Sequence, residues 1–260
     1  MTALLDVQHL SAAPYGAPLL RDIHFQLAAG ETLGLVGPNG AGKSSLLHCV
    51  AGSLPGNGGT VTLAGRELAD WPRLQRARAL AVQTQHAALN FPFSVEEVIL
   101  LGRIPHASGR AADRAVLEEV LAATDTAALR QRPYTQLSGG EKQRVQLARA
   151  AAQLWRPEDS AARLLLLDEP SAALDPSHQR MVMEVVAGMA ASGCAVIIAS
   201  HDFNLLSANV DRLLVMRDGS QYACGSPAEV LTGPVFDAVF AVPVEVIPHP
   251  VSGRPVVIQR

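Results

Sequence analysis

The stretch that decides how this chain folds is Gly37-Pro38-Asn39-Gly40-Ala41-Gly42-Lys43-Ser44. A glycine, four residues and then Gly-Lys-Ser is the pattern of a loop that binds nucleotide phosphates. Its glycines turn backbone N–H groups toward the β-phosphate, Lys43 reaches the β- and γ-phosphates, and the Ser44 hydroxyl can bind Mg²⁺. A plain glycine-rich turn is the alternative. The strand predicted at residues 31–36 and the helix predicted at 45–54 favour the phosphate loop, because such a site needs that setting.

Length and composition limit the kinds of protein this chain can be. Its 260 residues suffice for one large domain or two small ones, and the apolar share of 48% argues against disorder. The net charge of −3 without a basic block argues against a nucleic-acid binder. The three cysteines form no CxxC pair, and no signal peptide or membrane span is evident. We therefore expect a cytosolic protein whose membrane contact comes through a partner.

Buried strands alternate with amphipathic helices along the chain. Residues 164–167 and 195–200 are continuous apolar runs, typical of strands buried on both faces. Residues 113–124 and 177–191 carry apolar side chains at helical spacing. This alternation predicts an α/β fold with a parallel sheet, and the mostly helical stretch from 86 to about 157 predicts an inserted subdomain.

Two carboxylates follow one of the buried strands. Asp168 and Glu169 come directly after four leucines and before Pro170. Ligands bind at the carboxyl ends of strands in open α/β sheets. Asp168 is therefore a candidate to hold Mg²⁺, and Glu169 a candidate to polarise the water that attacks the γ-phosphate. An acidic turn at a strand end is the plainer alternative.

Two further polar residues end predicted strands. His201 follows the strand at 195–200 and can hydrogen-bond the γ-phosphate and the attacking water, although a lone histidine is more often structural. Gln85 ends the strand predicted at 79–85, and its amide can contact Mg²⁺ or water. Taken alone, Gln85 is better explained as an ordinary strand-end residue.

A second glycine-rich helix start lies at Ser138-Gly139-Gly140-Glu141. Ser138 and Glu141 have the spacing of a capping box, which is a purely structural explanation. The two glycines also expose backbone N–H groups at a helix N-terminus, which is an anion site. Both explanations can hold. A second anion site without a second nucleotide suggests that it serves the γ-phosphate of another subunit.

In this order, these motifs resemble those of the ATP-binding cassette family over nearly the whole chain. The resemblance makes residues 137–141 the signature, Gln85 the centre of the glutamine loop, residues 171–175 the D-loop and His201 the switch histidine. It implies a P-loop NTPase cassette with a mostly parallel core sheet, an antiparallel β subdomain and an inserted helical subdomain. We expect one nucleotide-binding domain over residues 1–240, followed by a small extension at 241–260.

The resemblance also implies ATP and Mg²⁺ as cofactors, and a role for each site residue. Tyr15 matches the position of an aromatic that stacks on adenine. Lys43, Gln85, Glu169 and His201 are the expected catalytic residues, and Ser44, Gln85 and Asp168 the expected metal ligands. The other residues expected to contact ATP are Gly37, Pro38, Asn39, Gly40, Ala41, Gly42, Ser45, Ser138, Gly139 and Gly140.

The partners implied by the resemblance define how such a site works. Two cassettes form a homodimer that sandwiches two ATP molecules head to tail, with Ser138–Gly140 of one closing over the phosphate held by the other. The Gln85 loop and helical subdomain receive two copies of a polytopic permease, and a periplasmic substrate-binding protein acts indirectly. We expect a peripheral protein at the cytoplasmic face of the cell inner membrane, without a nucleic-acid partner.

The segment after Gln85 is the most discriminating within the family. Residues 91–98 and Gly102-Arg103-Ile104-Pro105-His106 are similar to importers of iron–siderophores, haem and vitamin B12, and most similar to haemin importers. Haem ligation by His106 or His249 is not expected, because the cargo passes through the permease. A siderophore or vitamin B12 importer, or a non-import cassette ATPase, remains the alternative. The sequence lacks the Asn-Lys-x-Asp motif of a GTPase and the heptads of a chromosome-maintenance ATPase.

Overall fold

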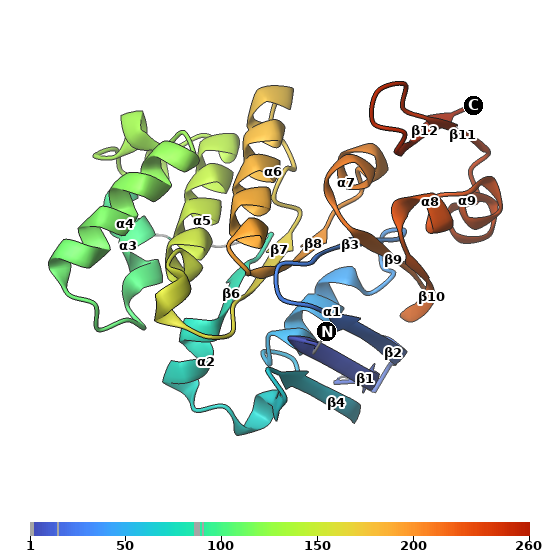
Figure 1. The fold of residues 1–260 in the computed structure, drawn as a ribbon, viewed down its shortest axis with the longest axis horizontal. Coiled ribbons are helices and arrows are strands. Elements are labelled where there is room, and N and C mark those ends of the chain that lie inside the picture. The colour runs from blue at the N-terminus through green and yellow to red at the C-terminus, as the bar shows by residue number, and fades with distance from the viewer. Residues whose placement is uncertain (1–2, 15, 86–88, 90) are drawn as a thin grey trace. The chain divides into compact units, whose positions relative to one another are not determined.

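The computed structural model describes residues 3–14, 16–85, 89 and 91–260. They form two compact units, one from residues 1–70 and 197–260 and the other from residues 71–196 (Figure 1). The first unit thus combines both ends of the chain, whereas the second is one continuous stretch. Within the described ranges, no helix combines the length and apolarity needed to cross a bilayer.

An antiparallel β region opens the first unit. β1 (Leu5–Ala12) pairs with β2 (Leu20–Leu27) on one edge and with β4 (Gly58–Leu63) on the other. The short β5 (Arg66–Glu67) pairs with β4. Burial alternates toward the end of β2, so that one face joins the core and the other meets solvent. This confirms the antiparallel β subdomain that the sequence predicts.

Parallel strands carry the glycine-rich loop of residues 37–42. β3 (Thr32–Val36) is buried along its whole length and runs parallel to β9 (Arg212–Arg217). The chain leaves β3 through the loop and enters α1 (Lys43–Val50). β9 returns as β10 (Ser220–Gly225) through Asp218-Gly219, where φ is 50° and 77°, as a tight hairpin turn requires. The strand order in this unit is β5-β4-β1-β2-β10-β9-β3.

One short helix, α7 (Phe203–Asn209), holds the last hairpin of the chain. That helix, α7, carries Asn204, whose side-chain amide donates to the Val257 carbonyl at 3.0 Å and accepts from the Val257 N–H at 2.7 Å. The hairpin predicted for the last twenty residues is therefore present and held by α7. The remaining elements of this unit are η1 (Leu68–Asp70), α7 (Phe203–Asn209), α8 (Pro227–Val230), α9 (Gly233–Phe240), β11 (Val244–Pro248) and β12 (Pro255–Gln259).

A parallel strand pair forms the base of the second unit. α2 (Arg73–Ala79) leads into β6 (Leu80–Gln83), which runs parallel to β7 (Leu164–Asp168). β6 ends two residues earlier than the sequence predicts. α6 (Pro176–Ala191) follows and leads to β8 (Ala195–Ala199), whose last residues belong to the first unit. Every residue of β7 and β8 is buried, as predicted for strands covered on both faces.

A helical cluster, green in Figure 1, makes up the middle of the second unit. It consists of α3 (Val95–Leu100), α4 (Arg110–Ala123) and α5 (Gly139–Leu154). Their apolar faces bury Val98, Val120 and Val145 in one core. The short helical turns are η2 (Leu101–Arg103), η3 (Ala127–Leu129), η4 (Tyr134–Gln136) and η5 (Pro157–Asp159).

The connection from α5 to β7, residues 154–163, is fastened to the unit. From sequence it is expected to be a surface loop longer than the family usually has. Arg163 is buried and donates to the Leu154 carbonyl at 2.9 Å. Asp159 accepts from the buried Arg103 guanidinium at 2.8 Å. The two ends of the segment are thus joined to each other, and Asp159 ties its middle to Arg103.

Candidate ATP site

The glycine-rich loop can be formed only with glycine at its first position. A Cβ on Gly37 would lie 2.4 Å from the Met216 carbonyl oxygen, so any side chain would push the loop off β9. This contact brings the backbone down onto the end of the sheet, where the parallel strands β3 and β9 finish together. The loop therefore starts at the edge where ligands bind in open α/β sheets.

The N-terminus of α1 has no cap of its own. Its N-cap residue, Gly42, has φ of 98° and no side chain that could accept a hydrogen bond from the first turn. No acidic residue lies in that turn. The first N–H groups of a helix need acceptors, and the helix dipole makes this end positive. An anion is therefore the partner that this helix end is built to accept.

The Lys43 ammonium group lies against the backbone at the start of this loop. Its Nζ donates to the Gly37 carbonyl at 2.7 Å and the Pro38 carbonyl at 3.2 Å. Ser44 is exposed and Ala41 is buried. The remaining predicted residues of the loop, Asn39, Gly40 and Ser45, are exposed, exposed and half-buried. The positive helix end, the ammonium group and the hydroxyl thus lie on one short segment, which suits a phosphate chain.

His201 lies beside the start of this loop in the first unit. The N–H of Ser200 donates to the Leu35 carbonyl at 3.2 Å, so the end of β8 runs next to the end of β3. His201 follows directly, and Asp202 caps α7 by accepting from the Leu205 N–H at 2.8 Å. The first unit therefore brings together two motifs that are about 160 residues apart in the chain.

The carboxylates and the glutamine share a sheet edge in the second unit. Gln83 pairs with Leu167 between the parallel strands β6 and β7, so Gln85, Asp168 and Glu169 leave the sheet at the same side. Asp168 is 6% exposed, whereas Gln85 is exposed. Glu169 has φ of 52°, a left-handed conformation that is uncommon for non-glycine residues and typical of functional sites.

The donor chemistry of the predicted metal ligands fits Mg²⁺. A hydroxyl, a carboxylate and an amide supply hard oxygen atoms, and Mg²⁺ usually binds one or two carboxylates together with waters and substrate phosphates. Among the described residues, no group of three or more His, Cys, Asp and Glu could hold a metal ion.

The start of α5 provides hydrogen-bond acceptors for its own backbone N–H groups through a capping box. Ser138 accepts from the Glu141 N–H at 3.3 Å, and Glu141 accepts from the Ser138 N–H at 2.7 Å, which confirms the predicted capping box. Arg132 donates to Glu141 at 2.8 Å. These bonds, led by that from the Ser138 N–H, lower the pKa of Glu141 below its usual 4.5. A Cβ on Gly140 would lie 3.3 Å from the Leu174 side chain, so this helix start packs on the D-loop.

The end of the D-loop is also held by local polar contacts. Asp175 caps α6 by accepting from the His178 N–H at 3.0 Å. The Ser177 hydroxyl, that N–H and the His178 ring lower the pKa of Asp175 far below its usual range. The His178 ring also contacts Asp125 at 3.3 Å, and Asp125 accepts from Arg144 at 3.0 Å. The sequence suggests no role for His178 or Asp125, because their contact joins segments that are distant in the chain.

One predicted site residue cannot be compared with the structure, and one unusual buried residue was not predicted. Tyr15, the predicted adenine-stacking residue, lies outside the described residues. Gln83 is 1% exposed, and its side-chain oxygen is buried without a hydrogen-bond partner in the described structure. A glutamine inside an otherwise apolar strand is the sequence signal that could have marked it, because a buried amide normally needs partners.

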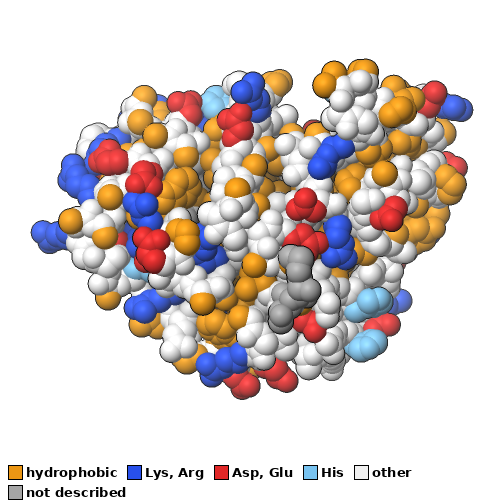
Figure 2. Space-filling view, viewed as in Figure 1, with side chains coloured by type: hydrophobic (Ala, Val, Ile, Leu, Met, Phe, Trp, Pro, Cys, Tyr) orange, Lys and Arg blue, Asp and Glu red, His pale blue; other side chains and the backbone are white. Residues whose placement is uncertain are grey.

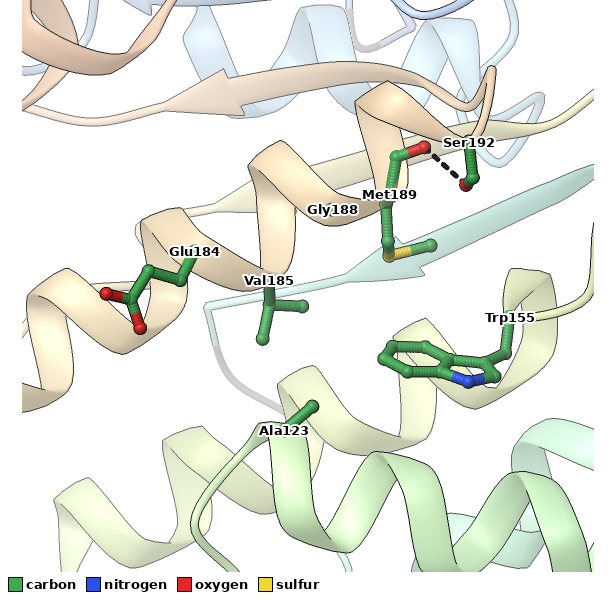
Figure 3. Close-up of a pocket in the computed structure, with 7 residues that line it drawn as sticks. All are labelled: Ala123, Trp155, Glu184, Val185, Gly188, Met189 and Ser192. Carbon is green, nitrogen blue, oxygen red and sulfur yellow. Dashed lines mark hydrogen bonds between the residues drawn. The ribbon is translucent and has the colours of Figure 1, made fainter.

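A pocket of about 450 Å³ in the second unit is separate from these residues (Figure 3). Trp155 and Met189 face each other across it, and Val185 and Ala123 complete its apolar walls. The Ser192 hydroxyl donates to the Met189 carbonyl at 2.7 Å. No predicted ATP-site residue lines this pocket.

Comparison with known proteins agrees with the motifs. Residues 20–172 match the family described as ABC transporter. The hemin import ATP-binding protein HmuV of Pseudomonas entomophila is 49% identical over 257 residues, covering 99% of this chain and all of that protein. HmuV of Pseudomonas aeruginosa is 45% identical over the same length and coverage.

Solved structures give the same fold. A transporter described as of the metal-chelate type, in an inward-facing conformation, has a TM-score of 0.79 at 25% identity, covering 100% of this chain and 99% of that chain. The ATP-binding subunit of an ABC transporter has a TM-score of 0.78 at 25% identity, covering 87% of this chain and 91% of that chain.

The fold and these comparisons define the class of protein, an ATP-hydrolysing P-loop cassette. The chain belongs to the ABC transporter family, as an ATP-binding subunit.

Proposed function

We propose that this chain is the ATPase subunit of a bacterial importer that takes up haemin through a membrane permease. The observation that carries the proposal is the 49% identity to a hemin import ATP-binding protein over 99% of this chain. The predicted ATP-site residues that the structure describes support it, because each lies at the end of a strand or the start of a helix. The uptake of a siderophore or vitamin B12 is the alternative that the experiments separate.

In this mechanism the first unit binds the phosphates of ATP. The uncapped start of α1 supplies N–H groups and a positive dipole, and Lys43 supplies a full charge at the same loop. Mg²⁺, held by Ser44, Gln85 and Asp168, would neutralise charge on the phosphate oxygens. Ser45 and the loop residues Pro38 and Asn39 line the nucleotide.

Hydrolysis depends on residues that act on water rather than on a covalent intermediate. Glu169 accepts the proton of the attacking water, and His201 and Gln85 orient that water and the γ-phosphate. The electrostatic stabilisation of the transferring phosphoryl group accounts for most of the rate. This places the reaction at the carboxyl ends of the strands.

The site is completed by a second copy of the chain. Ser138, Gly139 and Gly140 at the start of α5 cover the γ-phosphate held by Lys43 of the partner cassette. Because the capping box keeps this helix start folded before the phosphate arrives, little ordering is needed on closure. Closing and reopening of the homodimer would be the stroke that drives transport.

Exposed apolar side chains between Phe91 and Ile104 support the binding of permease subunits at this segment. Phe91, Phe93 and Ile104 are 67%, 38% and 72% exposed, which is unusual for large apolar side chains close in sequence. A pocket of about 460 Å³ lined by Leu100, Ile104 and charged neighbours lies on the same helical cluster. We infer that cytoplasmic helices of the permease bind here, which makes the chain peripheral at the inner face of the membrane. The periplasmic binding protein then acts only through the permease.

The face drawn in Figure 2 is consistent with protein partners. Lys and Arg side chains are interspersed there with Asp and Glu, rather than gathered in a basic patch. Because nucleic-acid binding rests on phosphate neutralisation by clustered cations, this mixture does not favour such a partner.

The first experiment tests the chemistry through Glu169→Gln. The amide keeps the size of the side chain but cannot accept the proton, so we expect ATP binding and ATP-dependent dimerisation to persist while turnover falls about 100-fold or more. Nucleotide affinity, size-exclusion chromatography and phosphate release measure the three properties. Turnover like that of the unmodified chain would remove Glu169 from the mechanism.

The second experiment tests the cargo. The chain is assembled with its permease in liposomes, and ATPase activity is measured with binding protein that is empty or loaded with haemin, a ferric siderophore or vitamin B12. Stimulation by haemin alone is expected. Stimulation by another chelate would move the chain to that cargo, and stimulation by none would exclude all three importers.

A further inference from the structure

The helix that starts with the signature also holds the backbone of the predicted catalytic base. Gln143 lies on α5, in the first turns after Ser138 and Gly140, and its Nε2 donates to the carbonyl oxygen of Glu169 at 2.5 Å. Both residues belong to the second unit and are partly buried. The contact joins two motifs that are 26 residues apart in the chain.

The carbonyl that Gln143 contacts sits at an unusual point of the backbone. Glu169 has φ of 52°, which few residues with a side chain adopt. Its carbonyl also accepts from the Ala172 N–H at 3.2 Å, which closes the turn into the D-loop. Such conformations persist only where the surroundings over-determine them. The amide of Gln143 adds a side-chain hydrogen bond to this carbonyl, which favours the observed direction of the peptide group.

The direction of that peptide group decides where the carboxylate points. Asp168, immediately before, is held in β7, so the left-handed turn at Glu169 sets the direction in which its side chain leaves the sheet. A rotation of the carbonyl toward the common β region would swing the Cβ to another direction. A catalytic base must be within hydrogen-bond reach of the proton it takes, and small displacements are costly.

We propose that Gln143 is a positioning residue for Glu169, and that it ties the orientation of the base to the position of the signature helix. The inference rests on the proposed role of Glu169 as the base. Because α5 is a continuous helix from Gly139 to Leu154, a shift of its first turn on phosphate contact carries Gln143 with it. The position of the start of α5 thereby controls the orientation of Glu169 in the same chain.

The test compares two glutamines on the same helix. Gln143→Leu removes the donor, and Gln143→Glu keeps the shape but places an acceptor against the carbonyl. The matched control is Gln153→Leu, because Gln153 also donates its amide to backbone carbonyls, those of Ala77 at 2.5 Å and Leu80 at 2.9 Å, away from Glu169. The full chain is used, and ATP turnover, KM and thermal unfolding are measured for each variant.

We expect kcat to fall about 10- to 100-fold in both Gln143 variants, with KM for ATP within about twofold of the unmodified chain. Gln153→Leu is expected to lower the unfolding temperature while leaving kcat within about twofold. Folded Gln143 variants with unchanged kcat would overturn the proposal. So would a parallel loss of kcat in the Gln153 control, because that would indicate general loosening of α5.

A double variant separates this inference from the proposed function. In the Glu169→Gln background, Gln143→Leu should lower the residual turnover no further, because residues that act as a unit are not additive. A second loss of equal size would show that Gln143 acts elsewhere. If Glu169→Gln alone keeps normal turnover, the assignment of the base fails. If it stops turnover while Gln143→Leu does not, only the role of Gln143 fails.

Discussion

The two glycine-rich helix starts of this protein solve the same problem in opposite ways. α1 begins at Gly42 with no side-chain cap and no acidic residue in its first turn. α5 begins at Ser138 with a complete capping box and an arginine on its glutamate. A helix end without a cap needs an acceptor from outside, whereas a capped end is stable alone. The comparison supports the proposal that α1 binds phosphate tightly and that α5 meets it only on closure of the proposed dimer.

The largest expected effect comes from removing the Lys43 ammonium group at the start of α1. Lys43→Ala should weaken ATP binding about 100-fold, because the ammonium makes charge-assisted bonds to the phosphates. The chain offers a matched control, since Lys142 on α5 is its only other lysine. Lys142 lies over the Tyr134 ring at 5.9 Å, and Lys142→Ala should change ATP affinity by less than about threefold.

Titration of a fluorescent ATP analogue measures both affinities. Equal losses in the two lysine variants would contradict the comparison, because they would mean that net charge, rather than the place of one ammonium group, controls binding.

A pair of glycine variants, one at each helix start, separates effects on folding stability from effects on phosphate contact. Gly42→Ala puts a side chain at φ of 98°, with its Cβ 3.0 Å from Leu20 and 3.1 Å from the Leu19 carbonyl, and should cost about 1–2 kcal/mol of stability. Gly139→Ala meets nothing within 4 Å in an ordinary helical conformation, so stability should hold.

ATPase activity gives a second way to tell the two helix starts apart. Gly139→Ala is expected to lose ATPase activity without losing ATP affinity, because in the proposed dimer its Cβ would stand where the γ-phosphate bound by the other cassette approaches. Urea unfolding and steady-state ATPase assays measure the two properties. Full activity in Gly139→Ala would remove that glycine from the phosphate contact.

The sequence predicts the local parts of this site well and the long-range contacts poorly. The apolar runs of β7 and β8 and the capping box of Ser138 follow from patterns within a few residues. α7 was missed, because Asp202 as its cap is the only strong local signal in a seven-residue helix. The bond from Gln143 to Glu169 has no periodic signature, since it depends on how α5 packs beside the end of β7.

The smallest expected effect is the loss of folding stability that the Glu141 carboxylate provides, as the pH is lowered. Glu141 has a lowered pKa because it accepts the Ser138 N–H and faces Arg132, so its charged form stabilises the folded state. A lowered pKa in the folded chain means that this contribution is complete above the usual value of 4.5 and is lost as the pH falls through the folded value. A carboxylate in the first turn of a helix contributes about 0.3–1 kcal/mol.

Glu141→Gln isolates this term, because an amide can complete the capping box without titrating. At pH 7 the variant should be slightly less stable than the unmodified chain, and the difference should vanish as the pH falls below about 4.5. Urea unfolding of both chains across this range measures the difference, in which the other acidic groups cancel. α1 has no carboxylate in its first turn, so no equivalent variant exists there. A difference that stays constant with pH would mean that Glu141 acts through packing, and that the two helix starts differ less in electrostatics than their caps suggest.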